Sequence, residues 1–318
     1  MTSRIVVISL IVIASICAGI LSGFISLHHK HAHAETELTA AHSEFQLALS
    51  TMSLRMAAMS KALERTSLLS PDIYSQIYND AARPSLRVHE RALALMTEFE
   101  TVEHAEDFFA EMRPQFKRAG YPAVNAVPDQ DAAAIFPAVF VEPPASRQNV
   151  FGYNIGTSPE RLSAAREAID ARVIAASAPV ILSQDRDERP SSFLLLYPVT
   201  LTAAIAPGKK TQAVLGAGLT PGSLFQDHII TDPGHILEFD LKIDGQSLPV
   251  TLGERSNVWL FSIPFLKNRI LPDIMINGLE ISLSASVFYA PHIEEVLTPV
   301  AIALLTGLFL MLLAKNLS

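Results

Sequence analysis

Two long apolar runs mark the ends of the chain, and the pattern between them is mixed. No charged residue occurs from Ile5 to Leu27, and a second uncharged run covers residues 296–314. At about 1.5 Å per residue, a helix over the first run is roughly 34 Å long, which is enough to cross the hydrocarbon core of a bilayer. We therefore predict two transmembrane helices, residues 5–27 and 296–314, on either side of a larger body.

The first run also has a second interpretation, that of a cleaved signal peptide. Ala32, His33 and Ala34 form an A-x-A site a few residues beyond the apolar stretch. The hydrophobic part of a signal peptide is about 7 to 15 residues long, and this run is longer. The length favours a retained membrane anchor.

Basic residues at the outer ends of the two runs predict the orientation. Arg4 precedes the first run and Lys315 follows the second. Because short cytoplasmic segments are enriched in Lys and Arg, both termini are predicted to be cytoplasmic. Residues 28–295 are then periplasmic or extracellular, and the chain belongs to the inner (plasma) membrane.

The residues after the first run carry a heptad pattern. Its seam positions are separated alternately by four and three residues, and one of them is polar. They are Leu38, His42, Phe45, Leu49, Met52, Met56, Met59 and Leu63. Such a seam predicts a long helix that packs either on a second helix or on the protein's own body. We expect the first arrangement, a parallel homodimer. Its interface residues are Leu49, Met52, Met56 and Met59.

The helical stalk built on this seam is predicted to cover residues 28–100. A polar stretch from Pro71 to Pro84 interrupts it, and a second helical segment over residues 85–99 leads to the body. Four histidines, His28, His29, His31 and His33, stand at its start. They have no carboxylate or cysteine companion at fixed spacing, so a polar linker is the simpler interpretation, with metal binding or pH sensing as the alternative.

The first part of the body, residues 101–228, alternates helices with short apolar strands. The expected helices cover residues 103–118, 158–173 and 222–228, and the expected strands cover residues 133–141, 179–184, 191–200 and 211–220. Gly120 marks the end of the first helix. The second helix begins either with a capping box of Thr157 and Glu160 or with Ser158 as its N-cap.

The second part of the body, residues 229–295, is rich in strands. They are expected at residues 235–244, 246–252, 258–265 and 279–289. Asp244 and Gly245 form a type I′ hairpin signal between the first two. The predicted fold class is therefore α+β: a long stalk helix, a membrane-distal lobe over residues 101–228 and a membrane-proximal lobe over residues 229–295, flanked by two transmembrane helices.

Charge and motif content exclude several classes of function. The net charge of −8 becomes more negative for the exported segment once Arg4 and Lys315 are removed, which disfavours nucleic acids and anionic lipid headgroups as partners. The chain has a single cysteine and so no intrachain disulfide. The motifs G-x-S-x-G, H-E-x-x-H, C-x-x-C and the P-loop are absent. We expect no catalytic residue, no metal site and no cofactor.

Several short motifs of the body resemble one family in their order and spacing. They are the Phe108 to Gly120 segment, Gly152-Tyr153-Asn154 with Pro159 and Arg161, Ser177-Ala178-Pro179 with Leu182, Tyr197-Pro198-Val199, and Leu215-Gly216. Over about residues 85 to 250 the chain resembles the CHASE domain, the extracytoplasmic sensor module of cytokinin receptors and of many bacterial histidine kinases and diguanylate cyclases. The resemblance implies a stalk helix followed by two PAS-like lobes, dimerisation through the stalk, and a small-molecule pocket in the membrane-distal lobe.

The resemblance also points to the residues of that pocket. Asn154 stands where plant members of the family have an aspartate that holds the ligand. An amide both donates and accepts hydrogen bonds, so a neutral ligand with a donor beside an acceptor is expected, and a turn residue is the alternative for Asn154. The other expected lining residues are Ser177, Pro179, Tyr197 and Gly216, with Phe136 and Phe140 as apolar walls.

The predicted function is that of a membrane-anchored sensor, not an enzyme, that binds a small molecule outside and passes a signal across the membrane. No output domain follows Lys315 in the sequence. We therefore expect a separate output protein in the cytoplasm or membrane. A periplasmic scaffolding protein and a membrane-anchored hydrolase are the alternatives.

Overall fold

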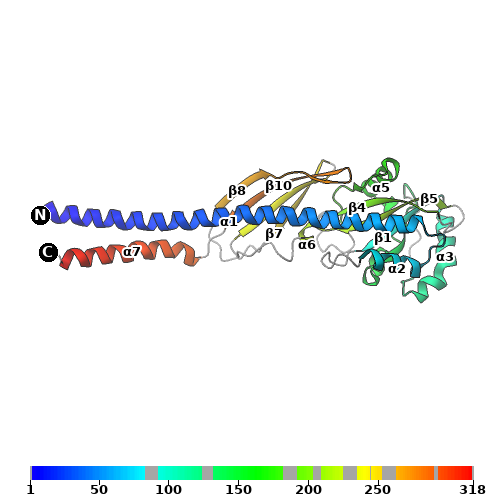
Figure 1. The fold of residues 1–318 in the computed structure, drawn as a ribbon, viewed down its shortest axis with the longest axis horizontal. Helices are drawn as coiled ribbons and strands as arrows, with labels where there is room; N and C mark the ends of the chain where they lie inside the picture. Colours follow the sequence, from blue (N-terminus) through cyan, green and yellow to red (C-terminus); the bar gives the residue numbers. More distant parts are fainter. Residues whose placement is uncertain are drawn as a thin grey trace.

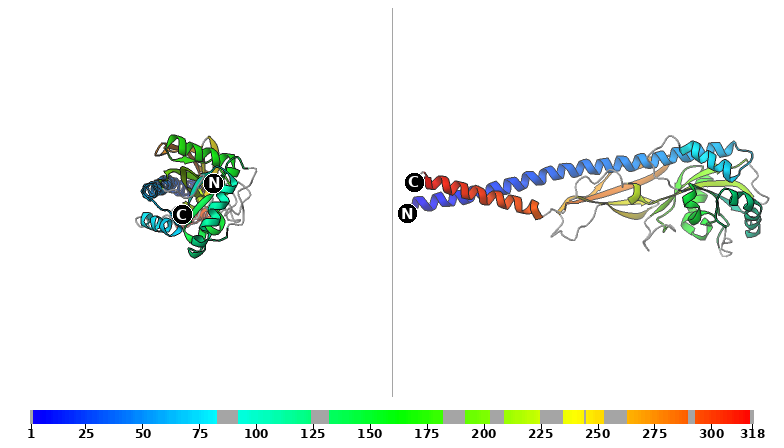
Figure 2. Two further views of the ribbon diagram at one scale, coloured as in Figure 1. Left: turned by 90° about the vertical axis from the view of Figure 1, so that its right-hand side faces the viewer. Right: turned by 90° about the horizontal axis from the view of Figure 1, so that it is seen from below.

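The protein is an elongated molecule with both termini at one end (Figure 1). The structure is a computed structural model, and it describes residues 2–82, 92–123, 132–181, 192–202, 209–224, 235–243, 245–252, 263–289 and 293–316. Two β-sheets follow one another along a single long helix, and the right-hand view of Figure 2 shows this helix running beside both of them. We call the sheet nearer to the termini the near sheet and the other the far sheet.

The long helix, α1 (Thr2–Glu64), includes both the first apolar run and the heptad pattern without a break. The chain then reverses, and α2 (Pro71–Ala82) packs against α1. Pro71 occupies the first turn of α2, where its missing N–H leaves no hydrogen bond unmade, and the Ser70 hydroxyl accepts a hydrogen bond from the N–H of Ile73 at 3.3 Å. The expected break in the long helix is therefore present, because α1 ends at Glu64, but residues 71–82 form a helix of their own instead of a polar interruption.

The far sheet has five antiparallel strands in the order β2-β1-β5-β4-β3. They are β1 (Leu93–Phe99), β2 (Ala138–Glu142), β3 (Ala175–Ala176), β4 (Phe193–Thr200) and β5 (Lys209–Leu219). Leu195 and Leu196, successive residues of β4, are both fully buried. Because successive side chains of a strand point to opposite faces, both faces of the far sheet are covered.

The helices of the far sheet lie in the connections between its strands. They are α3 (Val102–Arg118), the 3-10 turn η1 (Pro144–Ser146), α4 (Arg147–Val150), the 3-10 turn η2 (Ile155–Thr157) and α5 (Pro159–Ala171). Gly120 has φ +77° just after α3, as expected for its role in ending that helix. Ser158 accepts a hydrogen bond from the N–H of Arg161 at 3.4 Å, so the second of the two possible caps of α5 is the one present.

The prediction of a helix over residues 85–99 is wrong where the structure describes it. Residues 93–99 form β1, which pairs with β2 on one side and β5 on the other. Leucine, alanine and methionine favour helices, but their intrinsic preference is below 1 kcal/mol per residue. Two strand partners and the burial of nearly every side chain of β1 outweigh it.

The near sheet has the order β7-β6-β10-β8, and β9 pairs with β10 off this path. Its strands are β6 (His235–Ile243), β7 (Gln246–Leu252), β8 (Ile263–Ile270), β9 (Ile274–Ile276) and β10 (Leu279–Tyr289), and the short helix α6 (Pro221–Leu224) precedes them. The expected hairpin between β6 and β7 is confirmed, with Gly245 at φ +72°. Asp244 and residues 225–228, the end of an expected helix, lie outside the described residues.

The heptad seam of α1 faces the protein's own body. Leu49, Met52, Met56 and Met59 are each 0–2% exposed within the single chain. Their predicted role as a dimer interface is therefore wrong: the apolar stripe that would pack on a second copy covers the sheets instead. The polar seam residue His42 donates from Nε2 to the carbonyl of Pro272 at 2.9 Å, which ties α1 to the near sheet.

The last helix, α7 (Ile293–Asn316), returns beside the beginning of α1. A Cβ added to Gly19 would lie 2.9 Å from the Cβ of Ala303, and one added to Gly307 would lie 3.0 Å from Oγ of Ser15. Small residues thus allow the two helices to approach closely. Among the described residues, α1 holds a stretch long and apolar enough to cross a membrane, and Leu297–Leu312 of α7 is a shorter apolar stretch.

Candidate functional site

Asn154, the residue predicted to contact the ligand, holds the turn that follows α4. Its Oδ1 accepts hydrogen bonds from the N–H groups of Phe136 at 2.7 Å and Gly156 at 2.9 Å, and its Nδ2 donates to the carbonyl of Ala134 at 3.1 Å. The side chain is buried, at 5% exposure. This is the geometry of the turn residue that was the alternative to a ligand contact.

Two glycines allow this turn to pack closely. Gly152 has φ +78°, a left-handed conformation that glycine adopts without steric cost. A Cβ added to Gly156 would lie only 1.9 Å from the carbonyl oxygen of Ala134. The backbone of this segment pairs with β2, since the N–H of Ala138 donates to the carbonyl of Tyr153 and the N–H of Gly152 donates to the carbonyl of Ala138, both at 2.9 Å. The turn thus continues the far sheet beyond its edge strand.

Arg161 lies beside the turn at the start of α5. Its guanidinium hydrogen-bonds the hydroxyl of Tyr153, lies 5.0 Å from the centre of that ring, and donates to the carbonyl of Ile181 at 2.7 Å. Arg161 is buried, whereas Tyr153 and Ile181 are 38% and 43% exposed. Arg161 therefore connects α5 to the segment after β3. The exposed side chains of Tyr153 and Ile181 lie on the surface beside it.

The register of the far sheet separates the predicted pocket residues onto two faces. Phe140 pairs with Leu95, Leu95 with Leu215, and Leu215 with Tyr197, so these four form one row across the sheet. Gly216 pairs with Leu196 in the next row. Adjacent rows point to opposite faces. The prediction that Tyr197, Phe140 and Gly216 line one pocket is therefore wrong.

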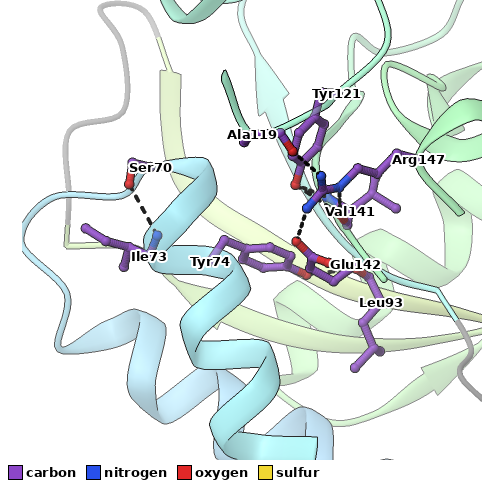
Figure 3. Close-up of polar contacts among 9 residues, drawn as sticks. All are labelled: Ser70, Ile73, Tyr74, Leu93, Ala119, Tyr121, Val141, Glu142 and Arg147. Atoms are coloured by element: carbon purple, nitrogen blue, oxygen red, sulfur yellow. Dashed lines mark hydrogen bonds and ion pairs between the residues drawn. The ribbon is translucent and has the colours of Figure 1, made fainter. Parts of the chain in front are cut away.

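The face that carries Phe140 is filled by side chains of the protein itself. Tyr74 of α2 stacks on Phe140, with ring centres 5.5 Å apart. The Tyr74 hydroxyl donates to the carbonyl of Leu93 at 2.9 Å (Figure 3). Burial raises the pKa of Tyr74 well above its ordinary value. Phe108 and Phe116 of α3 also contact Phe140. Phe140 is a core residue of the lobe.

The opposite face of the far sheet carries Gly216 beneath Met96. A Cβ on Gly216 would lie 2.1 Å from Cε of Met96 and 3.1 Å from Cδ2 of Leu196. Gly216 thus provides room that the flexible thioether of Met96 occupies.

Ser177 belongs to the edge of the same sheet. Its Oγ accepts a hydrogen bond from the N–H of Leu194 at 3.0 Å and donates to the carbonyl of Ala178 at 2.8 Å.

A buried ion pair that the sequence reasoning missed closes the other edge of the sheet (Figure 3). Arg147 pairs with Glu142 directly after β2, and both side chains are at least 95% buried. The guanidinium also hydrogen-bonds the carbonyl of Ala119, donates from Nε to the carbonyl of Val141 at 3.1 Å, and lies 4.0 Å from the centre of the Tyr121 ring. An arginine shortly after a continuously apolar strand was the available sequence signal.

Tyr121 completes this cluster, which we call the β2 edge cluster: Tyr121, Val141, Glu142 and Arg147. The Tyr121 hydroxyl donates to the carbonyl of Val141 at 2.9 Å and accepts from its N–H at 3.2 Å. Burial raises the pKa of Tyr121 to about 12. The unpaired backbone groups of an edge strand invite association with other strands, and here side chains satisfy them. The role of the β2 edge cluster is to close the sheet.

Comparison with known proteins identifies the family of this lobe. A family model for the CHASE domain matches residues 73–247, more than half of the chain. The chain belongs to the CHASE domain family. The match begins within α2 and ends at the start of β7, so it includes the whole far sheet. As a CHASE domain, residues 73–247 form an extracytoplasmic sensor module.

Among solved structures, the chain is similar to an extracellular ligand binding receptor from Desulfohalobium retbaense DSM5692. The two are 13% identical with a TM-score of 0.44, and the alignment covers 80% of this chain and 39% of that chain. The chain thus spans about two fifths of the length of that protein. No curated protein matches the chain.

Proposed function

We propose that this chain is a membrane-anchored CHASE sensor that binds a small molecule in the lobe built on the far sheet and transmits the binding event to its second membrane helix. The observation that carries the proposal is the family match over the far sheet and its helices. The strand order β2-β1-β5-β4-β3, with helices between β2 and β3, supports a PAS-like lobe. We place the ligand between the sheet and those helices.

The ligand site lies on the face of the far sheet that carries Gly216. Along β5 the floor there is lined by Gly216, which pairs with Ala94 of β1, and by Gly218, two residues further on the same face. Leu196 and Leu194 of β4 pair with these two glycines. Helix α5 packs on β3, β4 and β5 with alanines on its buried side. A ligand enters by displacing the Met96 side chain, which is flexible and polarizable. Asn154 and Ser177 then act as the frame of the site.

Both apolar helices span the membrane in this proposal, and residues 28–295 are periplasmic or extracellular. The two apolar segments expose large side chains on both sides of the contact between α1 and α7. These are Leu10, Val12, Ile13, Ile16, Ile20, Leu21, Phe24 and Ile25 of α1, and Leu297, Val300, Leu304, Leu305, Leu308, Phe309, Met311 and Leu312 of α7. Contiguous exposed apolar surface of this extent is suited to lipid. The positions of Arg4 and Lys315 outside the two apolar runs support cytoplasmic termini.

The route from the ligand site to α7 runs through the turn between β9 and β10. Asn277 and Gly278 form this turn, with φ +48° and +94°. A Cβ on Gly278 would lie 3.8 Å from Cγ1 of Val173, which follows α5, and Asn277 hydrogen-bonds Ser53 of α1. Strand β10 leads from this turn toward α7. A shift of α5 on ligand binding therefore displaces β10 relative to α1.

A homodimer is the remaining part of the proposal, and it uses the outer face of α1. Leu47 and Leu54 are 67% and 70% exposed and lie seven residues apart, on the side opposite the buried seam. Ser43, Ser50 and Ala57 continue the same stripe at alternating spacings of four and three. Two copies anchored in one membrane by the same helix meet in parallel. The second copy is the occupant that fits this face.

The test is a thermal-shift screen of the full chain in detergent against a library of small metabolites. A ligand raises the melting temperature of the wild type, and Gly216→Val, which fills the proposed site, removes the effect. Met96→Ala enlarges the site and changes the affinity without filling it. The control is Gly245→Ala, since a Cβ added to Gly245 would have no other atom within 4 Å. Hits that stabilise Gly216→Val as much as wild type contradict the assigned site.

A further inference from the structure

A buried arginine between α1 and α2 has no counter-charge among the residues that the structure describes. Arg55 is 7% exposed, and its Nε atom is buried without a hydrogen-bond partner. None of the ion pairs between described residues includes it. A buried cation without a partner is costly, because the lost hydration is not compensated by an opposite charge. Native folds rarely keep such a group without a use for it.

The neighbours of Arg55 hold the guanidinium in place and leave its charge unbalanced. Its central carbon lies 4.2 Å from the centre of the Tyr78 ring of α2, so one face of the planar group is covered by an aromatic surface. The nearby hydroxyl of Tyr74 donates to the carbonyl of Leu93, and Glu142 pairs with Arg147. These groups are therefore committed to other partners, and none of them neutralises Arg55.

We infer that Arg55 is the anchor of a second binding site, which takes a small monocarboxylate at the seam between α1 and α2. A guanidinium stacked by one face keeps its N–H edges for an anion in its plane, and a carboxylate fits those edges with two parallel hydrogen bonds. A single arginine supplies one positive charge, which matches a monoanion better than a phosphate dianion. The bound carboxylate would fasten α2 to α1. This inference is independent of the ligand proposed on the Gly216 face.

The experiment measures the melting temperature of the full chain in detergent with sodium acetate, sodium propionate or sodium phosphate against sodium chloride at equal ionic strength. Acetate or propionate is expected to raise the melting temperature by roughly 3 to 6 °C once its concentration exceeds Kd about tenfold. Arg55→Met keeps the length of the side chain and removes the charge. It should abolish this shift and, in chloride, melt no lower than wild type, because an unpaired buried charge has been removed.

The matched control is Arg113→Met, which removes an exposed arginine of α3. A carboxylate shift that persists in Arg113→Met and disappears in Arg55→Met supports the site. The inference is overturned if carboxylates stabilise all three proteins equally, if they stabilise none of them, or if phosphate stabilises the wild type more than either carboxylate.

Discussion

The side-chain amide of Asn277 donates a hydrogen bond from Nδ2 to the hydroxyl of Ser53 at 2.8 Å. These residues are 224 positions apart, and their contact joins the turn before β10 to the middle of the long helix α1. Because β10 leads toward α7, this bond connects the two elements that carry the apolar ends of the chain. It joins α1 to the strand that leads to α7, far from the place where the two helices pack directly on each other.

Loss of this bond should destabilise the protein by about 1 kcal/mol from either side. Asn277→Gly keeps a residue that tolerates the positive φ, and Ser53→Ala removes the hydroxyl with little change of volume. Thermal unfolding of the two single variants and the double variant forms a double-mutant cycle. The effects should be clearly non-additive, with the double variant close to either single one. Simple additivity would show that the two side chains do not interact.

Gly156→Ala should disrupt the Asn154 turn more than any other single methyl group added to a glycine in this lobe. Its Cβ would overlap the carbonyl oxygen of Ala134, which is backbone and cannot move away independently. Gly245→Ala is the control, since that position is strained by φ +72° but open, and about 1 kcal/mol is expected there. Unfolding curves for both variants compare them. Equal losses at the two sites contradict the close packing described for Gly156.

Glu142→Gln should cost about 3 to 5 kcal/mol, because it leaves the Arg147 guanidinium buried without its counter-charge. Arg269 and Glu35 provide the comparison, since this pair at 2.6 Å is about half exposed. Arg269→Met should cost no more than about 1 kcal/mol, as exposed ion pairs contribute little. The measurement is the free energy of unfolding of each variant. Similar losses for the two pairs would mean that the β2 edge cluster is not as buried as described.

High pH should destabilise the protein through Tyr121. Its pKa in the folded state is raised to about 12, so between pH 10 and pH 12 the unfolded chain releases this proton while the folded chain retains it. Stability that is present below pH 10 is therefore lost in this window, by about 2 to 3 kcal/mol for this residue. Tyr121→Phe lacks two hydrogen bonds and is therefore less stable at pH 7. Its stability does not fall between pH 10 and pH 12 on account of this residue, because phenylalanine has no proton to release. The free energies of unfolding of wild type and Tyr121→Phe, measured at each pH, should become more similar toward pH 12. A difference that stays constant with pH argues against a raised pKa of Tyr121.

Cysteine crosslinking tests which face of α1 meets a second copy. In a Cys17→Ser background, Leu54→Cys should form an intermolecular disulfide in membranes, because Leu54 is exposed on the proposed dimer face. Met56→Cys should not, since Met56 is fully buried against the chain's own body. Efficient crosslinking at position 56 with none at position 54 would show that the heptad seam, and not the Leu54 face, is the dimer interface.

Local signals in the sequence predicted several elements correctly. Gly120 ends α3 as expected, and Ser158 is one of the two N-caps expected for α5, because each acts on backbone groups of its own segment. The hairpin at Gly245 was predicted from an equally local turn signal. The Asn277-Gly278 pair between β9 and β10 carries the same kind of signal, and the prediction overlooked it.

Features that depend on distant parts of the chain were not predictable in the same way. Leu93–Phe99 has the composition of a helix and becomes a strand because β2 and β5 pair with it. A periodic stripe such as Met52 and Met56 shows that one face is covered, but not whether the chain or a second copy covers it. The proposed ligand site lies in the lobe that motif order pointed to and that the family model matches. Only the strand register could decide that Tyr197 and Gly216 face opposite ways.

Native mass spectrometry of the full chain, released from detergent or nanodiscs, tests the central claim most directly. If the chain is a small-molecule sensor, the wild type is expected to carry a non-covalent small molecule that is released when the collision energy is raised. Gly216→Val should lose this molecule and Gly245→Ala should retain it. A wild-type chain that folds and dimerises but has only its sequence mass, before and after incubation with a cell extract, would contradict the account.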